Sequence, residues 1–323
     1  MKQATEEGAR RASVLIFNDA ALDFQRALAP IFPSVEFLCA ETRDEALLHA
    51  GKVQAIFAYA HQVDEGLIAA AHELRWIQAL TTGTDRIAAL TNLDGSVIVT
   101  STRGIHGPQM AEMAFMHMLT LSRDCRRMWT NQRNGIWEQW PQPVLCGKTI
   151  TILGIGAIAE ALARRCKAFD MTVVGISGSE RAVENFDRIF TRDRIIDAVA
   201  LADYFVILVP YSASTDRIVN AEVLSAMKPS SWLINLARGG VVDEAALLDV
   251  LNRRAIAGAG LDVFAVEPLP QGHSFWSLDN VFISPHLGGL SDIYVEQVIP
   301  ILKTNLQHFL ANAPERMTNI VVR

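Results

Sequence analysis

Cysteine is scarce in this chain of 323 residues, which has only four: Cys39, Cys125, Cys146 and Cys166. They lie far apart and form no CxxC pair, so the sequence predicts neither a disulfide framework nor a zinc site. Six of the histidines have no metal-ligand spacing and are interpreted as surface or structural residues: His49, His61, His72, His117, His273 and His308. No bound metal is expected, and scattered cysteines of this kind favour a reducing compartment, so the predicted location is cytoplasmic.

The chain also lacks an excess of positive charge and any long apolar run. Lys and Arg number 29 against 35 Asp and Glu, a formal net charge of −6. This balance predicts no basic face for nucleic acid or for an anionic membrane. No apolar run reaches the ~18 residues of a spanning helix, and the opening MKQATEEGARR predicts no secretory signal. Half of the residues are hydrophobic, which favours a globular protein of about two domains.

Short apolar runs alternate with helical patterns along most of the chain. Five runs are predicted as buried strands of a first unit: 13–19, 35–40, 55–60, 74–80 and 96–101. Six more are predicted for a second unit: 149–153, 172–177, 204–209, 231–237, 257–263 and 280–285. This alternation is typical of parallel sheets with helices on both faces. The predicted fold class is α/β, with two doubly wound parallel-sheet domains, one flavodoxin-like and one a Rossmann dinucleotide-binding domain.

Between the two units, residues 107–135 are predicted to form one long helix. The pair Gly107-Pro108 is typical of a helix start, and an Asn-Gly pair marks the end. A helix of this length suits a spine between domains or subunits. A last helix is predicted at about 291–312 and is expected to return to the first unit.

A glycine-rich turn follows the first strand of the second unit. Gly154 allows the tight turn, and Gly156 removes the side chain that would block a pyrophosphate. Ala157 and Ile158 then begin a helix whose N-terminus offers free N–H groups and a positive dipole end to phosphates. Ala159 takes the third small position of the motif. Because the turn lies between a strand and a helix at the start of six βα repeats, it predicts a dinucleotide site.

The end of the next strand distinguishes NAD from NADP. NAD sites usually have Asp or Glu there, about 20 residues after the glycines, where it binds the ribose 2′-OH. Here the strand ends on Ser177, and Ser179 and Arg181 follow, all three able to donate hydrogen bonds to a 2′-phosphate. NADP(H) is therefore the predicted cofactor, with NAD(H) as the alternative. In that alternative Arg181 is a solvated loop residue and Glu180 binds the ribose.

Three chemically active side chains follow the fourth, fifth and sixth strands of the second unit: Arg238, Glu267 and His286. In a doubly wound sheet these strand ends share one edge with the glycine turn. An arginine fork can hold a carboxylate and polarise the neighbouring carbonyl. A histidine beside a carboxylate keeps a proton available near neutral pH. Together with hydride from a nicotinamide, this set suits the reduction of a 2-keto acid.

The motifs GIGAIA, NLARGGVVDEAAL, GLDVFAVEPLP and SPHLGG, in this order and spacing, resemble the D-isomer-specific 2-hydroxyacid dehydrogenase family. The resemblance is strongest to the glyoxylate/hydroxypyruvate reductase branch and covers nearly the whole chain. It implies that Arg238 binds the substrate carboxylate and carbonyl, that His286 is the general acid/base and that Glu267 pairs with His286.

The resemblance also implies contacts to the cofactor and the substrate. Asp262 would hold the nicotinamide carboxamide, and Thr82 and Gly83 would offer backbone N–H groups to the substrate carboxylate. Tyr59, directly after the third strand of the first unit, is placed to line the substrate mouth. Two more cofactor contacts are predicted near strand ends, at Pro210 and Ala237.

The family organisation implies a discontinuous substrate domain, formed by residues 1–105 and 288–323. The NAD(P)-binding domain, residues 106–287, would be inserted between them. A homodimer built on the long helix is implied, with a small 2-keto or 2-hydroxy acid as the other partner.

The predicted activity is hydride transfer from NADPH to a small 2-keto acid, glyoxylate or hydroxypyruvate first, giving the D-2-hydroxy acid. One alternative is NAD-dependent oxidation of a larger D-2-hydroxy acid. Another is a cofactor-sensing protein without activity, because the family resembles some transcriptional corepressors that keep the dehydrogenase fold. The complete set of Arg238, Glu267 and His286 favours an enzyme.

Overall fold

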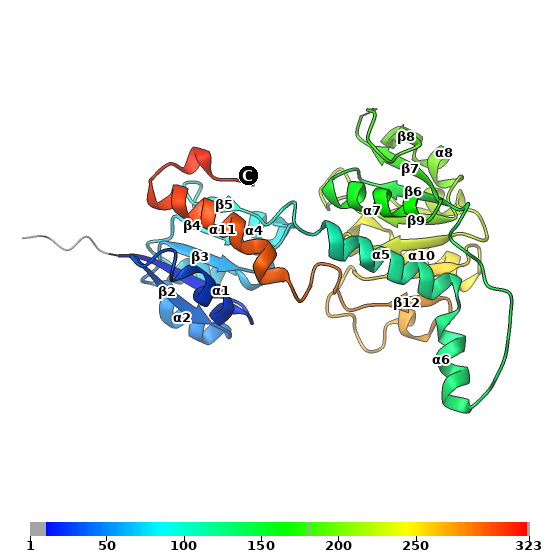
Figure 1. The fold of residues 1–323 in the computed structure, drawn as a ribbon, viewed down its shortest axis with the longest axis horizontal. Coiled ribbons are helices and arrows are strands. Elements are labelled where there is room, and N and C mark those ends of the chain that lie inside the picture. The colour runs from blue at the N-terminus through cyan, green and yellow to red at the C-terminus, as the bar shows by residue number, and fades with distance from the viewer. Residues whose placement is uncertain (1–10, 180, 322–323) are drawn as a thin grey trace, which may run out of the picture. The chain divides into compact units, whose positions relative to one another are not determined.

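The computed structural model describes residues 11–179 and 181–321, which divide into two compact units (Figure 1). Of these residues, 11–105 and 291–321 form the first unit, and those from 106 to 290 form the second. Each unit has its own parallel sheet, which confirms the predicted α/β class with two parallel sheets. In the described part of the chain, no helix combines the length and the apolar character needed to cross a membrane.

The first unit has five parallel strands in the order β2-β1-β3-β4-β5, the order of flavodoxin-like sheets. The strands are β1 (Ala12–Phe17), β2 (Val35–Ala40), β3 (Ala55–Ala58), β4 (Trp76–Ala79) and β5 (Ile98–Thr100). The helices are α1 (Ala21–Leu28), α2 (Arg43–Ala50), α3 (Glu65–Ala70), α4 (Asp85–Ala88) and α11 (Tyr294–Leu310). Buried side chains of α1 and α11 cover one face of the sheet, and those of α2 and α3 cover the other.

A buried polar network ties the late helix α11 to this sheet. Asn305 donates from Nδ2 to Gln78 Oε1 at 3.0 Å, and Thr100 Oγ1 donates to the same oxygen at 2.8 Å. Trp76 in turn donates from its indole nitrogen to Thr100 at 2.8 Å. Because buried polar groups are costly unless paired, this network fixes the position of α11 on the sheet.

The second unit has seven parallel strands in the order β12-β11-β10-β9-β6-β7-β8. They are β6 (Thr149–Leu153), β7 (Thr172–Ser177), β8 (Arg188–Thr191), β9 (Tyr204–Ile207), β10 (Trp232–Asn235), β11 (Gly258–Leu261) and β12 (Val281–Ile283). The helices are α5 (Gly107–Ser122), α6 (Cys125–Asn134), α7 (Ala157–Ala168), α8 (Ile195–Val199), α9 (Ala221–Ser225) and α10 (Glu244–Asn252). The strand order reverses between β6 and β9, and ligands of doubly wound sheets bind at the carboxyl ends of strands at such a point.

One strand of this sheet, β8, was not among the six predicted. It is a short edge strand in which only Phe190 is buried, while Arg188 is exposed. An edge strand of this kind carries almost no apolar run, so the pattern that identifies the central strands does not identify it.

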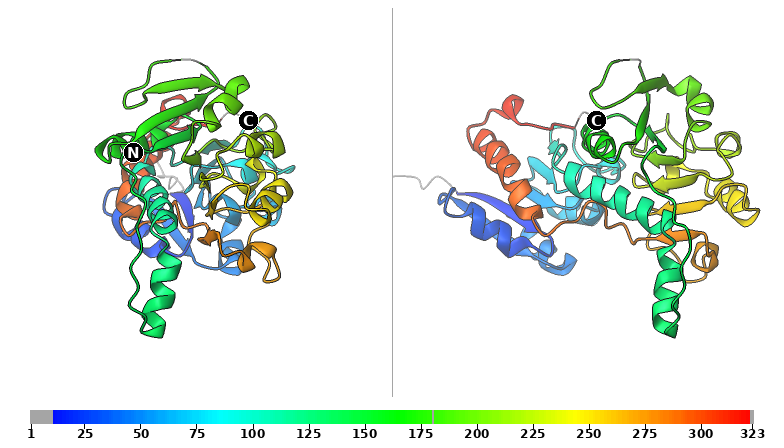
Figure 2. Two further views of the ribbon diagram at one scale, coloured as in Figure 1. Left: turned by 90° about the vertical axis from the view of Figure 1, so that its right-hand side faces the viewer. Right: turned by 45° about the vertical axis from the view of Figure 1, so that its right-hand side comes forward.

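The prediction of one long helix over 107–135 was wrong, because two helices occupy that range. The chain turns at Asp124, which has a left-handed backbone with φ 52°. Its side chain accepts a hydrogen bond from the Arg127 N–H at 3.3 Å and so caps α6. Aspartate is a strong N-cap and tolerates this conformation. Helix α6 and the connector after it extend away from the sheet of the second unit (Figure 2).

Candidate active site

The glycine turn after β6 is constrained by its neighbours. Gly154 has φ +98°, and a Cβ at this position would lie 2.7 Å from the backbone of Val209. Gly156 caps α7, and a Cβ there would meet nothing within 4 Å. Ala157 and Ile158 form the first turn of α7, and Ala159 is buried against the sheet. Gly154 is therefore required by the fold, whereas Gly156 leaves open space at a helix N-terminus that fits a dinucleotide phosphate.

The end of β7 lies next to this turn. Ser177 is the last residue of β7 and is half-buried, and Ser179 is exposed. Arg181 donates to the carbonyl of Ile155 at 3.0 Å, so its side chain rests on the glycine turn. Glu180, the acid of the NAD alternative, lies outside the described residues.

The two predicted contacts near the other strand ends differ in exposure. Pro210 is exposed beyond β9, and its carbonyl accepts a hydrogen bond from Thr215 Oγ1 at 2.7 Å. Ala237 is buried beyond β10, and its N–H donates to Asn235 Oδ1 at 3.1 Å. Both lie at the carboxyl edge that carries the glycine turn.

Arg238 is half-buried in the turn after β10. Asn235 donates to the Arg238 carbonyl at 3.0 Å, and the guanidinium donates to the Ala237 carbonyl at 2.8 Å. At Gly239, a Cβ would lie 1.9 Å from the carbonyl carbon of Phe264. The backbone that carries Arg238 therefore touches the backbone that leads to Glu267.

Glu267 and His286 form a hydrogen-bonded pair. Glu267 Oε2 lies 2.8 Å from His286 Nδ1, and Glu267 Oε1 accepts from the Phe264 N–H at 3.0 Å. Burial works to raise the pKa of Glu267, but the hydrogen bonds from His286 and Phe264 and the charge of Arg238 outweigh it and lower the pKa. An ionised carboxylate only accepts, so Nδ1 of His286 carries the proton of this bond. Nε2 is then the imidazole nitrogen that can give or take a proton.

Asp262 is almost completely buried, at 1% exposure, beneath the turn that carries His286. Its carboxylate accepts from Ser284 Oγ at 2.5 Å and from the N–H groups of Leu287 and Gly288, each at 2.9 Å. The sequence predicted Asp262 only as a cofactor contact. Its bonds to this turn, and the contact of Ser284, were not predicted, because no sequence pattern marks them.

The predicted substrate residues of the first unit lie at the carboxyl edge of its own sheet. Tyr59 follows β3, is half-buried and stacks on His61 with ring centroids 5.8 Å apart. Burial, with the charge of Asp19 and a hydrogen bond to it, raises the pKa of Tyr59 to about 12, so the hydroxyl is neutral. Thr82 and Gly83 follow β4; Thr82 is exposed, and the Gly83 carbonyl accepts from Thr81 at 2.7 Å.

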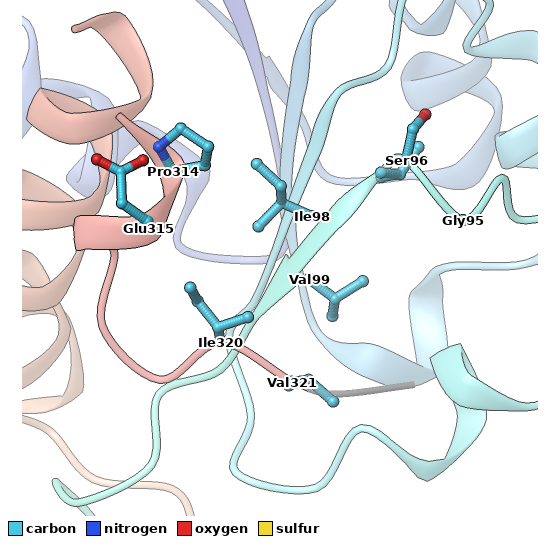
Figure 3. Close-up of a pocket in the computed structure, with 9 residues that line it drawn as sticks. Gly95, Ser96, Ile98, Val99, Pro314, Glu315, Ile320 and Val321 are labelled. Carbon is cyan, nitrogen blue, oxygen red and sulfur yellow. The ribbon is translucent and has the colours of Figure 1, made fainter. Parts of the chain in front are cut away.

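The first unit also has a pocket of about 330 Å³ with a different lining (Figure 3). It lies between β5 and the C-terminal segment, and its lining includes Ile98, Val99, Pro314, Glu315 and Ile320. None of the predicted site residues lines it, so it is not the candidate site. Among the described residues there is also no cluster of three or more side chains that could hold a metal ion.

The chain is similar to known proteins in both sequence and fold. Residues 115–288 match the family model described as D-isomer specific 2-hydroxyacid dehydrogenase, NAD binding domain. A glyoxylate reductase of Pyrococcus furiosus is 31% identical over 257 residues, which are 77% of this chain and 76% of that protein.

Two solved structures have the same fold over nearly the full length. A D-isomer specific 2-hydroxyacid dehydrogenase family protein of Aeromonas salmonicida has a TM-score of 0.90 at 28% identity, covering 97% of this chain and 99% of its own. A D-isomer specific 2-hydroxyacid dehydrogenase from Xanthobacter autotrophicus, in complex with NADPH and MES, has a TM-score of 0.82 at 28% identity. That match covers 96% of this chain and 98% of the other.

Proposed function

We infer the activity from one premise: the chain belongs to the D-isomer specific 2-hydroxyacid dehydrogenase family. It is an NAD(P)-dependent 2-hydroxyacid dehydrogenase, and the family predicted from the motifs is confirmed. We propose that it reduces small 2-keto acids with NADPH to D-2-hydroxy acids, with glyoxylate and hydroxypyruvate as the preferred substrates. The observation that supports this most is the Glu267–His286 pair at the same sheet edge as Arg238 and the glycine turn.

The proposed roles follow from the hydrogen-bonding capacity of each group. The Arg238 guanidinium binds the substrate carboxylate and polarises the keto oxygen. His286 donates the proton on Nε2 to that oxygen as negative charge develops there, and Glu267 stabilises the imidazolium that serves as the acid. When bound at the glycine turn, the nicotinamide dinucleotide supplies the hydride. We assign the second unit to cofactor binding, with Asp262 at the carboxamide and Pro210 and Ala237 as further contacts.

We assign the first unit to substrate binding. The proposed substrate domain, residues 1–105 and 288–323, carries Tyr59 at the end of β3 and Thr82 and Gly83 after β4. A neutral tyrosine hydroxyl and backbone N–H groups suit the hydroxyl and carboxylate oxygens of a small 2-keto acid. The glyoxylate reductase of Pyrococcus furiosus supports this substrate class.

The test of this function is an assay of NADPH and NADH oxidation against a panel of 2-keto acids. We expect turnover with glyoxylate and hydroxypyruvate to exceed that with larger 2-keto acids, and kcat/KM to be higher with NADPH. A preference for NADH with a larger substrate would contradict the proposal. Tight cofactor binding without any turnover would instead indicate a cofactor-sensing protein.

The proposed NADPH preference has a specific cause at the end of β7. Ser177 leaves no carboxylate there, and Arg181 rests on the glycine turn. The Xanthobacter relative, with NADPH bound, supports the same choice. Replacing Arg181 by Ala should lower kcat/KM for NADPH by roughly 10- to 100-fold, since a hydrogen bond to a charged group contributes about 1.5–3 kcal/mol.

The same Arg181→Ala change should leave kcat/KM for NADH nearly unchanged. Arg164→Ala, at an exposed position on α7, is the matched control and should affect neither cofactor. Equal losses with the two cofactors in Arg181→Ala would show that Arg181 acts on the fold of the turn and not on a 2′-phosphate.

Replacing Glu267 by Gln tests the role of its charge. Since the pKa of Glu267 is lowered, the carboxylate is ionised at neutral pH and takes up a proton only in more acidic solution. We expect kcat/KM of the wild type to fall as the pH falls through the pKa of Glu267. Glu267→Gln has no carboxylate to titrate, so it should lose this acidic decline, and its kcat/KM at neutral pH should be lower by roughly 10- to 100-fold, because a charge-assisted hydrogen bond contributes about 1.5–3 kcal/mol. The measurement is the pH profile of kcat/KM. The control is Glu244→Gln, which changes a nearby carboxylate that accepts from Ala265 instead; an unchanged profile in Glu267→Gln would contradict the assignment.

We also propose a homodimer and a cytoplasmic location. Helix α6 and the connector after it expose large apolar side chains: Trp129 is 52% exposed, Trp137 91% and Val144 49%. A second subunit that covers these side chains would remove them from water. The thiols of all four cysteines are free, which supports a reducing compartment.

A further inference from the structure

A buried hydrogen-bond chain runs from helix α5 to the turn that carries His286. His117 Nε2 lies 3.0 Å from Ser284 Oγ, and Ser284 Oγ lies 2.5 Å from Asp262 Oδ1. None of these three side chains is more than 4% exposed. The chain therefore links the middle of a helix to a buried carboxylate.

Asp262 holds the backbone of His286 and of the two residues that follow it. Its oxygens Oδ1 and Oδ2 accept from the N–H groups of Leu287 and Gly288, and its carbonyl accepts from the His286 N–H at 2.8 Å. His286 itself has φ +52°, a left-handed conformation that is uncommon for residues other than glycine. Surrounding contacts must maintain such a conformation, and Asp262 supplies three of them.

The distances assign each proton of the chain. Both carboxylate oxygens of Asp262 accept N–H groups, so the carboxylate is an acceptor and the single hydroxyl proton of Ser284 points to it. Ser284 Oγ can then only accept from His117, which must carry its proton on Nε2. Burial lowers the pKa of His117 to about 4, so the ring is neutral. Its Nδ1 is consequently an acceptor.

The residues around His117 leave space for its ring and pack against it. Nδ1 is buried and has no hydrogen-bond partner among the described residues. A Cβ at position 260 would lie 2.4 Å from Nδ1, so Gly260 leaves the space that the ring fills. Phe282 packs edge-on against the ring, with centroids 5.0 Å apart. A buried nitrogen without a hydrogen-bond partner destabilises the fold. Proteins tolerate such destabilising groups mainly at functional sites.

We propose that His117 and Ser284 are positioning residues of the active site, which hold the Asp262 carboxylate and through it the turn that aims His286. The proposal rests on the proposed role of His286 as the proton donor. Neither residue is required to contact substrate or to change its protonation during the reaction.

The kinetic test compares Ser284→Ala with Ser284→Thr. Alanine removes the hydroxyl and with it the hydrogen bond to Asp262. We expect kcat to fall by roughly 10- to 100-fold, the usual loss when a hydrogen bond that orients an active-site residue is removed. KM for the 2-keto acid should change by less than about twofold, since the proposed substrate contacts of Arg238 and of the first unit stay. Threonine keeps the hydroxyl and should restore most of kcat. His117→Leu removes the donor and should resemble Ser284→Ala.

A purely structural role would lower the melting temperature of Ser284→Ala without lowering kcat at temperatures where the variant is folded. That outcome would overturn the proposal. Loss of kcat in Ser284→Thr equal to that in Ser284→Ala would also overturn it.

A second measurement does not depend on turnover. The ring ¹⁵N signals of labelled histidine distinguish the two tautomers, and His117→Leu identifies the signal of His117. We expect the form with the proton on Nε2, unchanged between pH 8 and pH 6; the other tautomer or a charged ring would overturn the proposal. The His286 ring signals should move in Ser284→Ala and return in Ser284→Thr, and unmoved signals would overturn it as well. If these signals behave as expected but the wild type reduces no 2-keto acid, only the proposed function fails.

Discussion

Replacement of His286 by Ala is expected to lower kcat for reduction of a 2-keto acid by roughly 10²- to 10⁴-fold, the usual contribution of a positioned proton donor. The imidazole bonds through Nδ1 to Glu267, so Nε2 is the nitrogen whose loss matters. Alanine leaves the keto oxygen without a donor, while the residues of the glycine turn, where the dinucleotide is proposed to bind, are unchanged. Steady-state kinetics with glyoxylate and hydroxypyruvate gives kcat, and fluorescence titration gives the NADPH dissociation constant.

The NADPH dissociation constant of His286→Ala should stay within about threefold of the wild-type value. The matched control is His72→Ala, which removes an exposed histidine of the first unit and should not change kcat. Near-normal turnover of His286→Ala would contradict the assignment of His286 as the proton donor. A large loss of NADPH binding would instead show that the change had disturbed the cofactor site.

Replacement of Arg238 by Ala is expected to lower kcat/KM by roughly 10²- to 10⁴-fold. The estimate takes two hydrogen bonds from a charged donor, each contributing about 1.5–3 kcal/mol to binding of the carboxylate and of the developing charge. Arg238→Lys should recover only part of this loss, because an ammonium group cannot reproduce the two parallel bonds of a guanidinium. Both KM and kcat should be affected, since the same group binds the substrate and polarises its carbonyl.

The control for Arg238 is Arg253→Ala, which breaks an exposed ion pair with Asp249 on α10. Exposed pairs contribute little, so its kcat/KM should match that of the wild type. Wild-type kinetics in Arg238→Lys would show that a positive charge alone is sufficient, and would contradict the proposed two-bond contact.

The sequence was sufficient to predict the fold class and the family. The central strands are continuous apolar runs because both faces of each sheet are covered, and this pattern is visible without any tertiary information. The glycine motif was informative for a similar reason. Gly154 is required by its own φ and by the close approach of Val209. The backbone at this position therefore requires a glycine, and the glycine is visible in the sequence.

Other features depend on contacts that a local pattern does not contain. The separate helices α5 and α6 follow from one left-handed residue, Asp124, within a stretch that is otherwise helical by pattern. His117 reads from the sequence as a structural histidine, because its relation to Ser284 joins residues 167 positions apart. The roles assigned to Arg238, Glu267 and His286 remain predictions that the kinetic experiments test.

The contact at Gly239 has a consequence for how specificity could change in this enzyme. Because the backbones on either side of that contact touch, the main chain and not the choice of side chains sets the spacing between Arg238 and Glu267. Arg238 is the proposed carboxylate-binding group, and Glu267 is the proposed partner of the proton donor. Substitutions that change which substrates are accepted therefore cannot act by separating these two groups without displacing both loops. Adaptation to other 2-keto acids is expected to draw on the loops of the first unit, which leaves the reaction chemistry constant while the substrate varies.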